Sequence, residues 1–137
     1  MNTDLAPTIA DLLGAQYPAA RVDGRPLTPL LGSAPPPESA WRQHVLIEHW
    51  EQQDDFSLLA DFQALRSDQF SYIAWYTEEK EFYNVEVDPF QVINRIDSFG
   101  GRRIEQMDLR MRELMTCRGD SCRELEDAPL SLRPLQP

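Results

Sequence analysis

The sequence predicts an α+β fold: a small antiparallel sheet of about four strands, packed by a C-terminal helix and preceded by a short N-terminal helix. Short runs rich in aromatic and β-branched residues fill the middle of the chain, and turn residues separate them. Apolar residues then recur every three or four positions from Ile104 to Met115, the spacing of an amphipathic helix. With 137 residues, the chain can form one core without help from a metal or a disulfide.

The first predicted element is a helix over residues 5–14. Pro7 suits the first turn of a helix, and Gly14 can adopt the left-handed conformation that ends one. The apolar stripe of this helix is formed by Leu5, Ile9, Leu12 and Leu13. Asp23-Gly24 is a turn pair, and residues 33–38 form a proline-rich connector where the main boundary is expected.

Four strands follow this connector. They are predicted over residues 44–50, 63–66, 70–76 and 82–85. The last two read as a hairpin whose charged turn, residues 78–81, carries Lys80 at its tip. Pro89 ends the strand region, because proline offers no amide donor to a sheet.

Charge excludes one class of function. The chain has 13 Lys and Arg against 23 Asp and Glu, so its formal net charge is −10. Because this charge repels phosphate backbones, we expect no nucleic-acid partner. No apolar run approaches the roughly 20 residues of a membrane span, so no membrane association is expected.

Metal and redox chemistry have few candidates. Cys117 and Cys122 enclose Arg-Gly-Asp-Ser, and they form either a local disulfide or two free thiols; a disulfide would indicate an oxidising compartment. His44 and His49 lie five apart on a predicted strand and point to opposite faces, so they cannot share a metal there. Asp54-Asp55 could attract a cation or belong to a solvated loop.

Nucleophile motifs are missing as well. The sequence has no Gly-x-Ser-x-Gly elbow and no phosphate-binding glycine loop. The residues themselves therefore predict no catalytic site.

Several segments, read in order, resemble type I sulfatases. Residues 2–14 are similar to the segment N-x-D-L-A-P-T-L-x-D-L-A-G of that family, and residues 23–31 to D-G-x-S-L-x-P-L-L. Residues 64–73 resemble A-V-R-T-x-x-Y-K-Y-I, and residues 82–94 resemble E-L-Y-D-L-x-x-D-P-x-E-x-x-N. The ending, Met115 to Arg123, is similar to the tail of N-acetylglucosamine-6-sulfatase-like members.

The resemblance covers only the C-terminal part of such an enzyme. Type I sulfatases hydrolyse sulfate esters with a formylglycine, made from the Cys or Ser of a Cys/Ser-x-Pro-x-Arg motif, and with a calcium ion. Residues 33–37 have no Arg in the fifth place, and neither cysteine begins such a motif. The resemblance therefore implies no catalytic residue, no metal ligand and no cofactor in this chain.

The resemblance also implies a division of the chain and a set of partners. Residues 1–33 correspond to a remnant of the catalytic α/β domain, residues 34–127 to the C-terminal subdomain, and residues 128–137 to a proline-rich tail. Glu48, His49 and Arg66 are candidates for contacts at the edge of the substrate cleft. The expected partner is the missing N-terminal domain or, through residues 1–31, a second copy. The family is often extracytoplasmic. The alternative function is a stand-alone module that binds a protein or a carbohydrate.

Overall fold

The computed structural model describes residues 1–50 and 60–130, and the chain forms two compact units. The first unit combines Met1–Gln43 with Glu113–Pro129, and the second is built by His44–Arg112. Each unit is described by itself below. Within the described ranges, no helix has the length and apolar character needed to cross a membrane.

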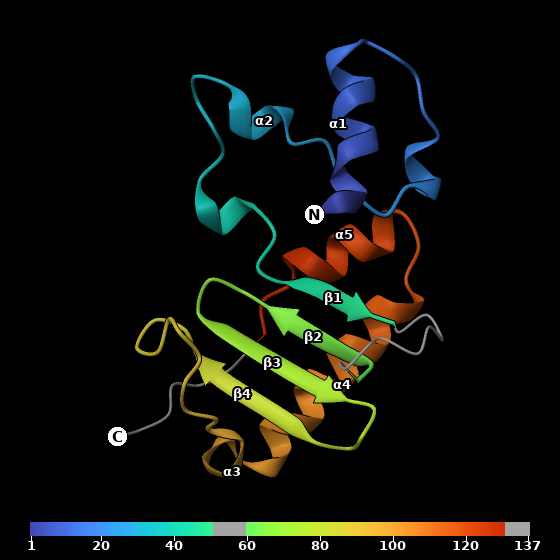
Figure 1. The fold of residues 1–137 in the computed structure, drawn as a ribbon. Helices are drawn as coiled ribbons and strands as arrows, with labels where there is room; N and C mark the ends of the chain where they lie inside the picture. Colours follow the sequence, from blue (N-terminus) through green and yellow to red (C-terminus); the bar gives the residue numbers. More distant parts are fainter. Residues whose placement is uncertain (51–59, 131–137) are drawn as a thin grey trace. The chain divides into compact units, whose positions relative to one another are not determined.

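The second unit contains the predicted four-stranded antiparallel sheet (Figure 1). Its strands pair in chain order, each with the next, so the sheet is a simple meander. Leu65 in the second strand lies opposite Leu46 on one side and Tyr72 on the other, and both Leu65 and Tyr72 are fully buried. The strands are β1 (Val45–His49), β2 (Phe62–Arg66), β3 (Phe70–Trp75) and β4 (Lys80–Asn84).

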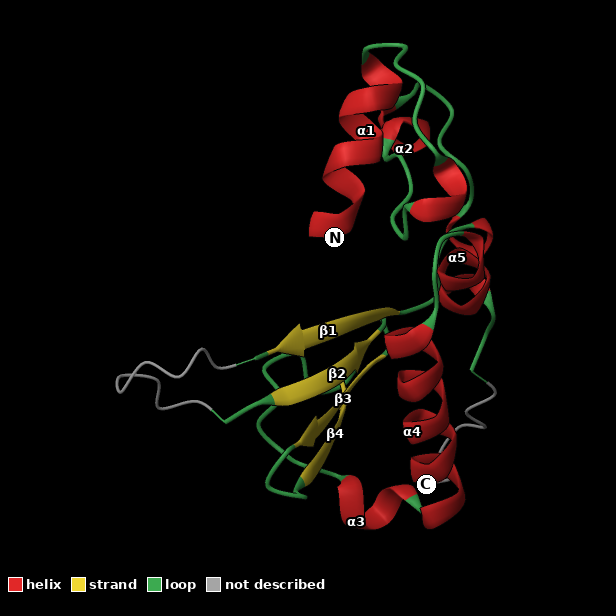
Figure 2. Cartoon of the chain, turned by 90° about the vertical axis from the view of Figure 1, so that its right-hand side faces the viewer, coloured by secondary structure: helices red, strands yellow, loops and turns green. Residues whose placement is uncertain are grey.

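Helix α4, Gly101–Thr116, covers one face of this sheet (Figure 2). Met107 and Met111 of its apolar stripe are buried, as the spacing of the sequence predicts. The Tyr72 hydroxyl donates a hydrogen bond to Oδ1 of Asp108 at 2.7 Å, which ties the helix to β3. The short helix α3, Ile96–Phe99, closes one end of the core, where Phe99 stacks on Phe82 with ring centroids 3.7 Å apart.

The hairpin between β3 and β4 differs from the sequence prediction. Lys80 and Glu81 were expected in the turn, whereas the turn ends before Lys80 and both residues belong to β4. Each charged side chain finds a partner from its strand position. The Lys80 ammonium pairs with Oδ2 of Asp108 at 2.6 Å, and Oε1 of Glu81 accepts a bond from the Trp75 indole at 3.0 Å. These contacts explain why charged residues occupy a strand here.

The first unit consists of short helices. Helix α1 confirms the predicted N-terminal helix, and Gly14 just beyond it has φ +63°. Helix α5 was not predicted, and it packs with the N-terminal segment. The elements are η1 (Asn2–Asp4), α1 (Leu5–Leu12), η2 (Ala19–Arg21), α2 (Thr28–Leu31), η3 (Glu38–Ala40) and α5 (Asp120–Asp127).

A disulfide joins Cys117 to Cys122, with Cα atoms 5.1 Å apart. Of the two alternatives left open by the sequence, the structure therefore has the bonded one. The bridge closes a six-residue loop that connects the end of α4 to the start of α5.

Candidate functional site

The three predicted edge residues occupy β1 and β2 but do not converge. His49 lies opposite Phe62 at one end of this strand pair, and Arg66 lies opposite Val45 at the other end. Four residue-to-residue steps along β1 separate the two ends, a distance of about 13 Å. Glu48 neighbours His49 in sequence but projects from the opposite face, because side chains alternate along a strand. One small ligand therefore cannot contact all three.

His49 belongs to an aromatic row that crosses three strands. Its ring stacks on Phe62 with centroids 5.5 Å apart, and Phe62 packs against Trp75 at 5.0 Å. Trp50, which follows His49, contacts Tyr76 edge to face at 5.2 Å and is half exposed. This row gives the end of the sheet an apolar and aromatic surface. His44 is buried, lies outside β1, and contacts Arg110 through Nε2 at 3.0 Å.

No metal centre is found in the part of the chain that the structure describes, since no three His, Cys, Asp or Glu side chains there are grouped to hold an ion. The Asp54-Asp55 pair lies outside the described residues. Both cysteines are consumed by the disulfide.

The first unit contains a cluster of charged side chains that the sequence did not reveal. This ion cluster comprises Asp4, Arg25, Arg42, Glu126 and Asp127. Arg42 is its centre, because Nη2 lies 2.9 Å from Oδ1 of Asp4 and Nε lies 3.7 Å from Oε2 of Glu126. Arg25 pairs with Glu126 at 3.3 Å and with Asp127 at 2.8 Å. Asp4 and Glu126 are buried, so the two arginines compensate carboxylates that have lost most of their water.

Burial and hydrogen bonding act against each other on these carboxylates. Burial by itself would raise the pKa of Asp4, but bonds from Arg42, the Arg25 amide and the N-terminal amine outweigh it and hold that pKa below its ordinary value. Burial raises the pKa of Glu126, because the nearby Arg42 and Arg25 charges offset it only partly. The two carboxylates of one cluster therefore shift in opposite directions.

The Asp-Gly turn and a second glycine fix the backbone around this ion cluster. A side chain on Gly24 would collide with the Thr3 carbonyl group. The Asp23 carboxylate accepts a hydrogen bond from the Gly119 amide at 2.7 Å, which links the turn to the start of α5. Gly119 has φ +58°, and a side chain there would collide with the Ala20 carbonyl group. Close backbone approach thus requires glycine at both positions.

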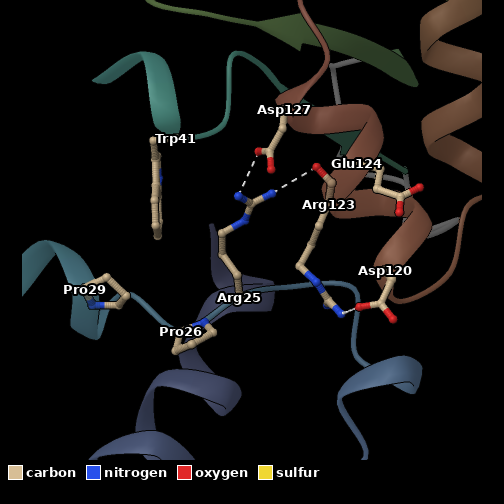
Figure 3. Close-up of a pocket in the computed structure, with 8 residues that line it drawn as sticks. All are labelled: Arg25, Pro26, Pro29, Trp41, Asp120, Arg123, Glu124 and Asp127. Carbon is tan, nitrogen blue, oxygen red and sulfur yellow. Dashed lines mark hydrogen bonds and ion pairs between the residues drawn. The ribbon is translucent and has the colours of Figure 1, made fainter. Parts of the chain in front are cut away.

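A pocket of about 460 Å³ opens beside the ion cluster (Figure 3). The Arg25 guanidinium lies 5.3 Å from the centre of the Trp41 ring, a cation–π contact. Arg123 is held by the Val22 and Gly24 carbonyl oxygens and by an ion pair with Asp120. Because Arg25 and Arg123 are paired with Asp127 and Asp120, the pocket offers the Trp41 indole face and the Glu124 carboxylate rather than free cations. Its lining is Arg25, Pro26, Pro29, Trp41, Asp120, Arg123, Glu124 and Asp127.

The apolar stripe of α1 is uncovered. Leu12 is 66% exposed, and Leu31 of the neighbouring helix α2 is 71% exposed. Apolar side chains gathered this way mark an interaction surface more often than an ordinary protein exterior. The stripe residues, all exposed by more than half, are Leu5, Ile9, Leu12 and Leu13.

Sequence reasoning missed the ion cluster because its members come from both ends of the chain, from Asp4 to Asp127. The one available signal was indirect. Asp4 and Arg25 stand inside the two N-terminal segments that resemble the sulfatase motifs, whereas nothing marked Glu126.

A family model described as N-sulphoglucosamine sulphohydrolase, C-terminal, matches residues 1–117. Among curated proteins, N-acetylglucosamine-6-sulfatase of Homo sapiens is 24% identical over an alignment of 151 residues, and the match covers 89% of this chain. The chain spans only 27% of the length of that relative.

Solved structures share the fold. The structure of BT4656 in complex with its substrate D-glucosamine-2-N,6-O-disulfate matches with a TM-score of 0.69 and 22% identity, over 93% of this chain and 25% of that one. The phosphonate monoester hydrolase of Agrobacterium radiobacter matches with a TM-score of 0.57 and 21% identity, over 82% and 23% of the two chains. This chain therefore belongs to the N-sulphoglucosamine sulphohydrolase C-terminal family and corresponds to the C-terminal portion of sulfatase-family enzymes.

Proposed function

We propose that this chain serves as the C-terminal portion of a sulfatase, where it packs against a catalytic region and shapes the substrate cleft, and that it has no turnover of its own. The observation that carries this proposal is the match of residues 1–117 to a C-terminal family model, together with coverage of only 27% of the human relative. The catalytic region, on the same polypeptide or a separate one, would supply the formylglycine and the calcium ion. Sulfate-ester cleavage needs such a preorganised set of charges around the transferred group.

The uncovered apolar residues of the first unit support a docking role. In the proposed division of the chain, residues 1–33 are the remnant that completes the catalytic domain, and residues 34–127 form the C-terminal subdomain, followed by the tail 128–137. The α1 stripe lies within residues 1–33, so the catalytic region is the partner that would bury its apolar side chains. Without that region, a second copy of the chain would bury the stripe by associating through residues 1–31.

Glu48, His49 and Arg66 are still proposed to contact substrate at the cleft edge, but each at a different place. His49 and Arg66 lie at opposite ends of the β1–β2 pair, so each would contact a different part of a sulfated sugar chain. His49 adds the neighbouring aromatic row, on which a sugar ring can stack, whereas Glu48 projects from the other face.

Sedimentation velocity tests this function. The sulfatase catalytic region encoded with or beside this chain is expected to form a complex with the full 137-residue chain. Leu12→Glu places a charge in the α1 stripe and should abolish that complex. Leu109→Glu, at an exposed leucine of α4, is the matched control and should bind like the wild type. A chain that stays monomeric and ignores the catalytic region would contradict the proposal.

A second candidate is a stand-alone carbohydrate-binding module, and the pocket beside Trp41 favours it. An indole face flanked by carboxylates suits a neutral or amine-bearing sugar, while the net charge of −10 disfavours a sulfated one. Binding on a glycan array that Trp41→Ala abolishes, with no complex formed with the catalytic region, would favour this candidate.

A further inference from the structure

The two outer strands of the sheet, β1 and β4, differ in how their free edges are covered (Figure 1). At β4, the Phe82 amide donates to Oδ1 of Asn94 at 3.0 Å, and the Phe82 carbonyl oxygen accepts a bond from the Arg95 amide at 2.8 Å. The Asn94 side-chain amide also donates to the Lys80 carbonyl oxygen at 3.2 Å. The residues that follow β4 therefore satisfy its outer backbone groups.

The pairing of β2 with β3 determines which backbone groups of β2 face β1. The Tyr76 amide donates to the Asp61 carbonyl oxygen, and the Ser67 amide donates to the Phe70 carbonyl oxygen, both at 3.0 Å. In an antiparallel pair, the residues that exchange hydrogen bonds alternate with residues that do not. The odd-numbered residues of β2 therefore bond to β3, and the even-numbered residues bond to β1.

This alternation leaves two residues of β1 with their backbone groups pointing away from the sheet. By register, the even-numbered residues of β2 lie opposite Val45, Ile47 and His49, so these three bond inward. The amide and carbonyl groups of Leu46 and Glu48 point outward. Within the part of the chain that the structure describes, no group forms a hydrogen bond with them. The outer edge of β1 is thus open.

The composition of β1 does not protect this edge. Natural sheets usually block an outer strand with a proline, a lysine, a bulge or a covering segment, because open amide groups are a template for another strand. The five residues of β1, Val-Leu-Ile-Glu-His, include neither proline nor lysine and pair with β2 without a bulge. Ile47, on the sheet face opposite α4, is 44% exposed. A second strand can therefore add both hydrogen bonds and apolar contact.

The edge is complementary to itself in one antiparallel register, with a two-fold axis at Ile47. All five residues of each strand are then paired, and Leu46 lies opposite Glu48 of the second copy. Because these are the outward-pointing residues, they form about four main-chain hydrogen bonds. An axis at Leu46 or Glu48 pairs only three of the five residues. An axis at Glu48 also places two carboxylates directly opposite each other, which is unfavourable.

We propose that two copies of this chain associate through β1 in this register, so that their sheets become one continuous sheet. The net charge of −10 on each copy opposes association, but at physiological salt charges further apart than about 8 Å are largely screened. The contact itself places no like charges opposite each other. It lies in the second unit and does not use the α1 stripe, so it does not depend on the proposed function.

Cysteine cross-linking tests the register, in a chain that carries Leu12→Glu so that the α1 stripe cannot hold two copies together. Ile47 and its counterpart form a pair without mutual hydrogen bonds, whose Cα atoms lie about 4.5 Å apart, within the range of a disulfide. Both native cysteines are already bonded to each other, so an introduced thiol is the only free one. We expect Ile47→Cys to form a covalent dimer on mild oxidation.

Val45→Cys is the matched control, because Val45 lies on the same face of the same strand. In the proposed register its counterpart lies about 13 Å away along the strands, so Val45→Cys should stay monomeric on a non-reducing gel. No covalent dimer from Ile47→Cys, which is also the result expected if a strand of the catalytic region occupies this edge, would overturn the proposal. Equal cross-linking of the two variants would overturn it too.

Sedimentation equilibrium of the same Leu12→Glu chain tests the backbone contact. Glu48→Pro removes an outward-pointing amide and leaves the bonds to β2 in place, so it should weaken association by about tenfold or more. Glu48→Thr removes the same carboxylate but keeps the amide, and it should associate at least as tightly as Leu12→Glu alone. Far-ultraviolet circular dichroism confirms that each variant is folded.

Two sedimentation results would contradict the proposal. One is a Leu12→Glu chain that stays monomeric at about 100 μM, which requires no change in β1. The other is a folded Glu48→Pro variant that associates as tightly as its parent. The proposed function fails by a different result, the absence of a complex with the catalytic region, so the two failures are distinguishable.

Discussion

The two units of this molecule are stabilised by different means. In the second unit, a four-stranded sheet and α4 enclose a continuous apolar core, with Leu65, Tyr72 and Met107 fully buried. In the first unit, short helices are held by a buried ion cluster, a disulfide and two tightly packed glycines, while the leucines of α1 face outward. The second unit thus resembles a self-sufficient core, and the first resembles one side of an interface whose other side is elsewhere.

Breaking the ion cluster should have the largest effect. Arg42→Met leaves Asp4 and Glu126 buried with one cation fewer, and we expect the first unit to lose about 3–5 kcal/mol of stability. Urea denaturation with amide hydrogen exchange measures the loss and assigns it to α5 and η1. Arg21→Met, at an exposed arginine in the same unit, is the control and should change stability by less than about 0.5 kcal/mol. Equal effects of the two substitutions would refute the central place of Arg42.

Paired leucine substitutions sharpen the contrast between the units. Leu65→Ala opens a cavity in the sheet core and should cost about 2–5 kcal/mol. Leu12→Ala removes the same atoms from an exposed position, so the free energy of unfolding of the isolated chain should change little. Thermal denaturation compares the two directly. A large loss from Leu12→Ala would mean that the α1 stripe is covered within the chain itself.

Opening the disulfide should have a moderate effect that stays in the first unit. For a loop of six residues, the chain-entropy model gives about 2 kcal/mol of stabilisation. We expect the double variant Cys117→Ser with Cys122→Ser to speed hydrogen exchange in α5 while exchange in β2 and β3 stays as in the wild type. Equal acceleration in the sheet would contradict separate stabilisation of the two units.

The smallest effect is a pH dependence of stability to which the two buried carboxylates, Asp4 and Glu126, contribute with opposite signs. Because the pKa of Asp4 is lowered, the stability that its ionised carboxylate gives the folded state is fully present above the ordinary pKa of aspartate. That stability is lost as pH falls through the lowered pKa. Because the pKa of Glu126 is raised, the folded state favours its protonated form, and that contribution is lost as pH rises through the raised pKa.

Single variants should separate these opposing contributions. Asp4→Asn should lose most stability near neutral pH and converge with the wild type in acid. The stability of Glu126→Gln relative to the wild type should increase as pH rises. Urea denaturation midpoints between about pH 3 and pH 7 measure both trends, and parallel pH profiles for the two variants would show that the shifts do not oppose each other.

How far the fold could be predicted follows from the range of the interactions involved. Alternation and three-to-four spacing are local patterns, so the sheet, α4 and α1 could be read from residues such as Tyr72, Met107 and Ile9. The sequence predicted the start of β4 at Phe82 instead of Lys80. A charged residue looked like part of a turn, because its partner Asp108 lies in a helix 28 positions away. Helix α5 was missed because it is short and its apolar residues are only Cys122 and Leu125, of which the cysteine was assigned to a turn.

The candidate site was less predictable than the fold. Glu48, His49 and Arg66 were chosen from strand ends, but register decides which ends and faces coincide, and a sequence does not give register. The ion cluster depends on pairs such as Arg25 with Glu126, 101 positions apart, which only the folded first unit brings together.

Turnover of an aryl sulfate tests most directly whether this chain is the C-terminal portion of a sulfatase. The assay compares the chain alone, a formylglycine-bearing catalytic region that lacks this portion, and the two mixed, each with calcium present. We predict no turnover by the chain alone, little by the catalytic region alone, and a clear rise on mixing that Leu12→Glu prevents. Calcium-dependent turnover by the pure chain, or full activity of the catalytic region without it, would contradict this assignment.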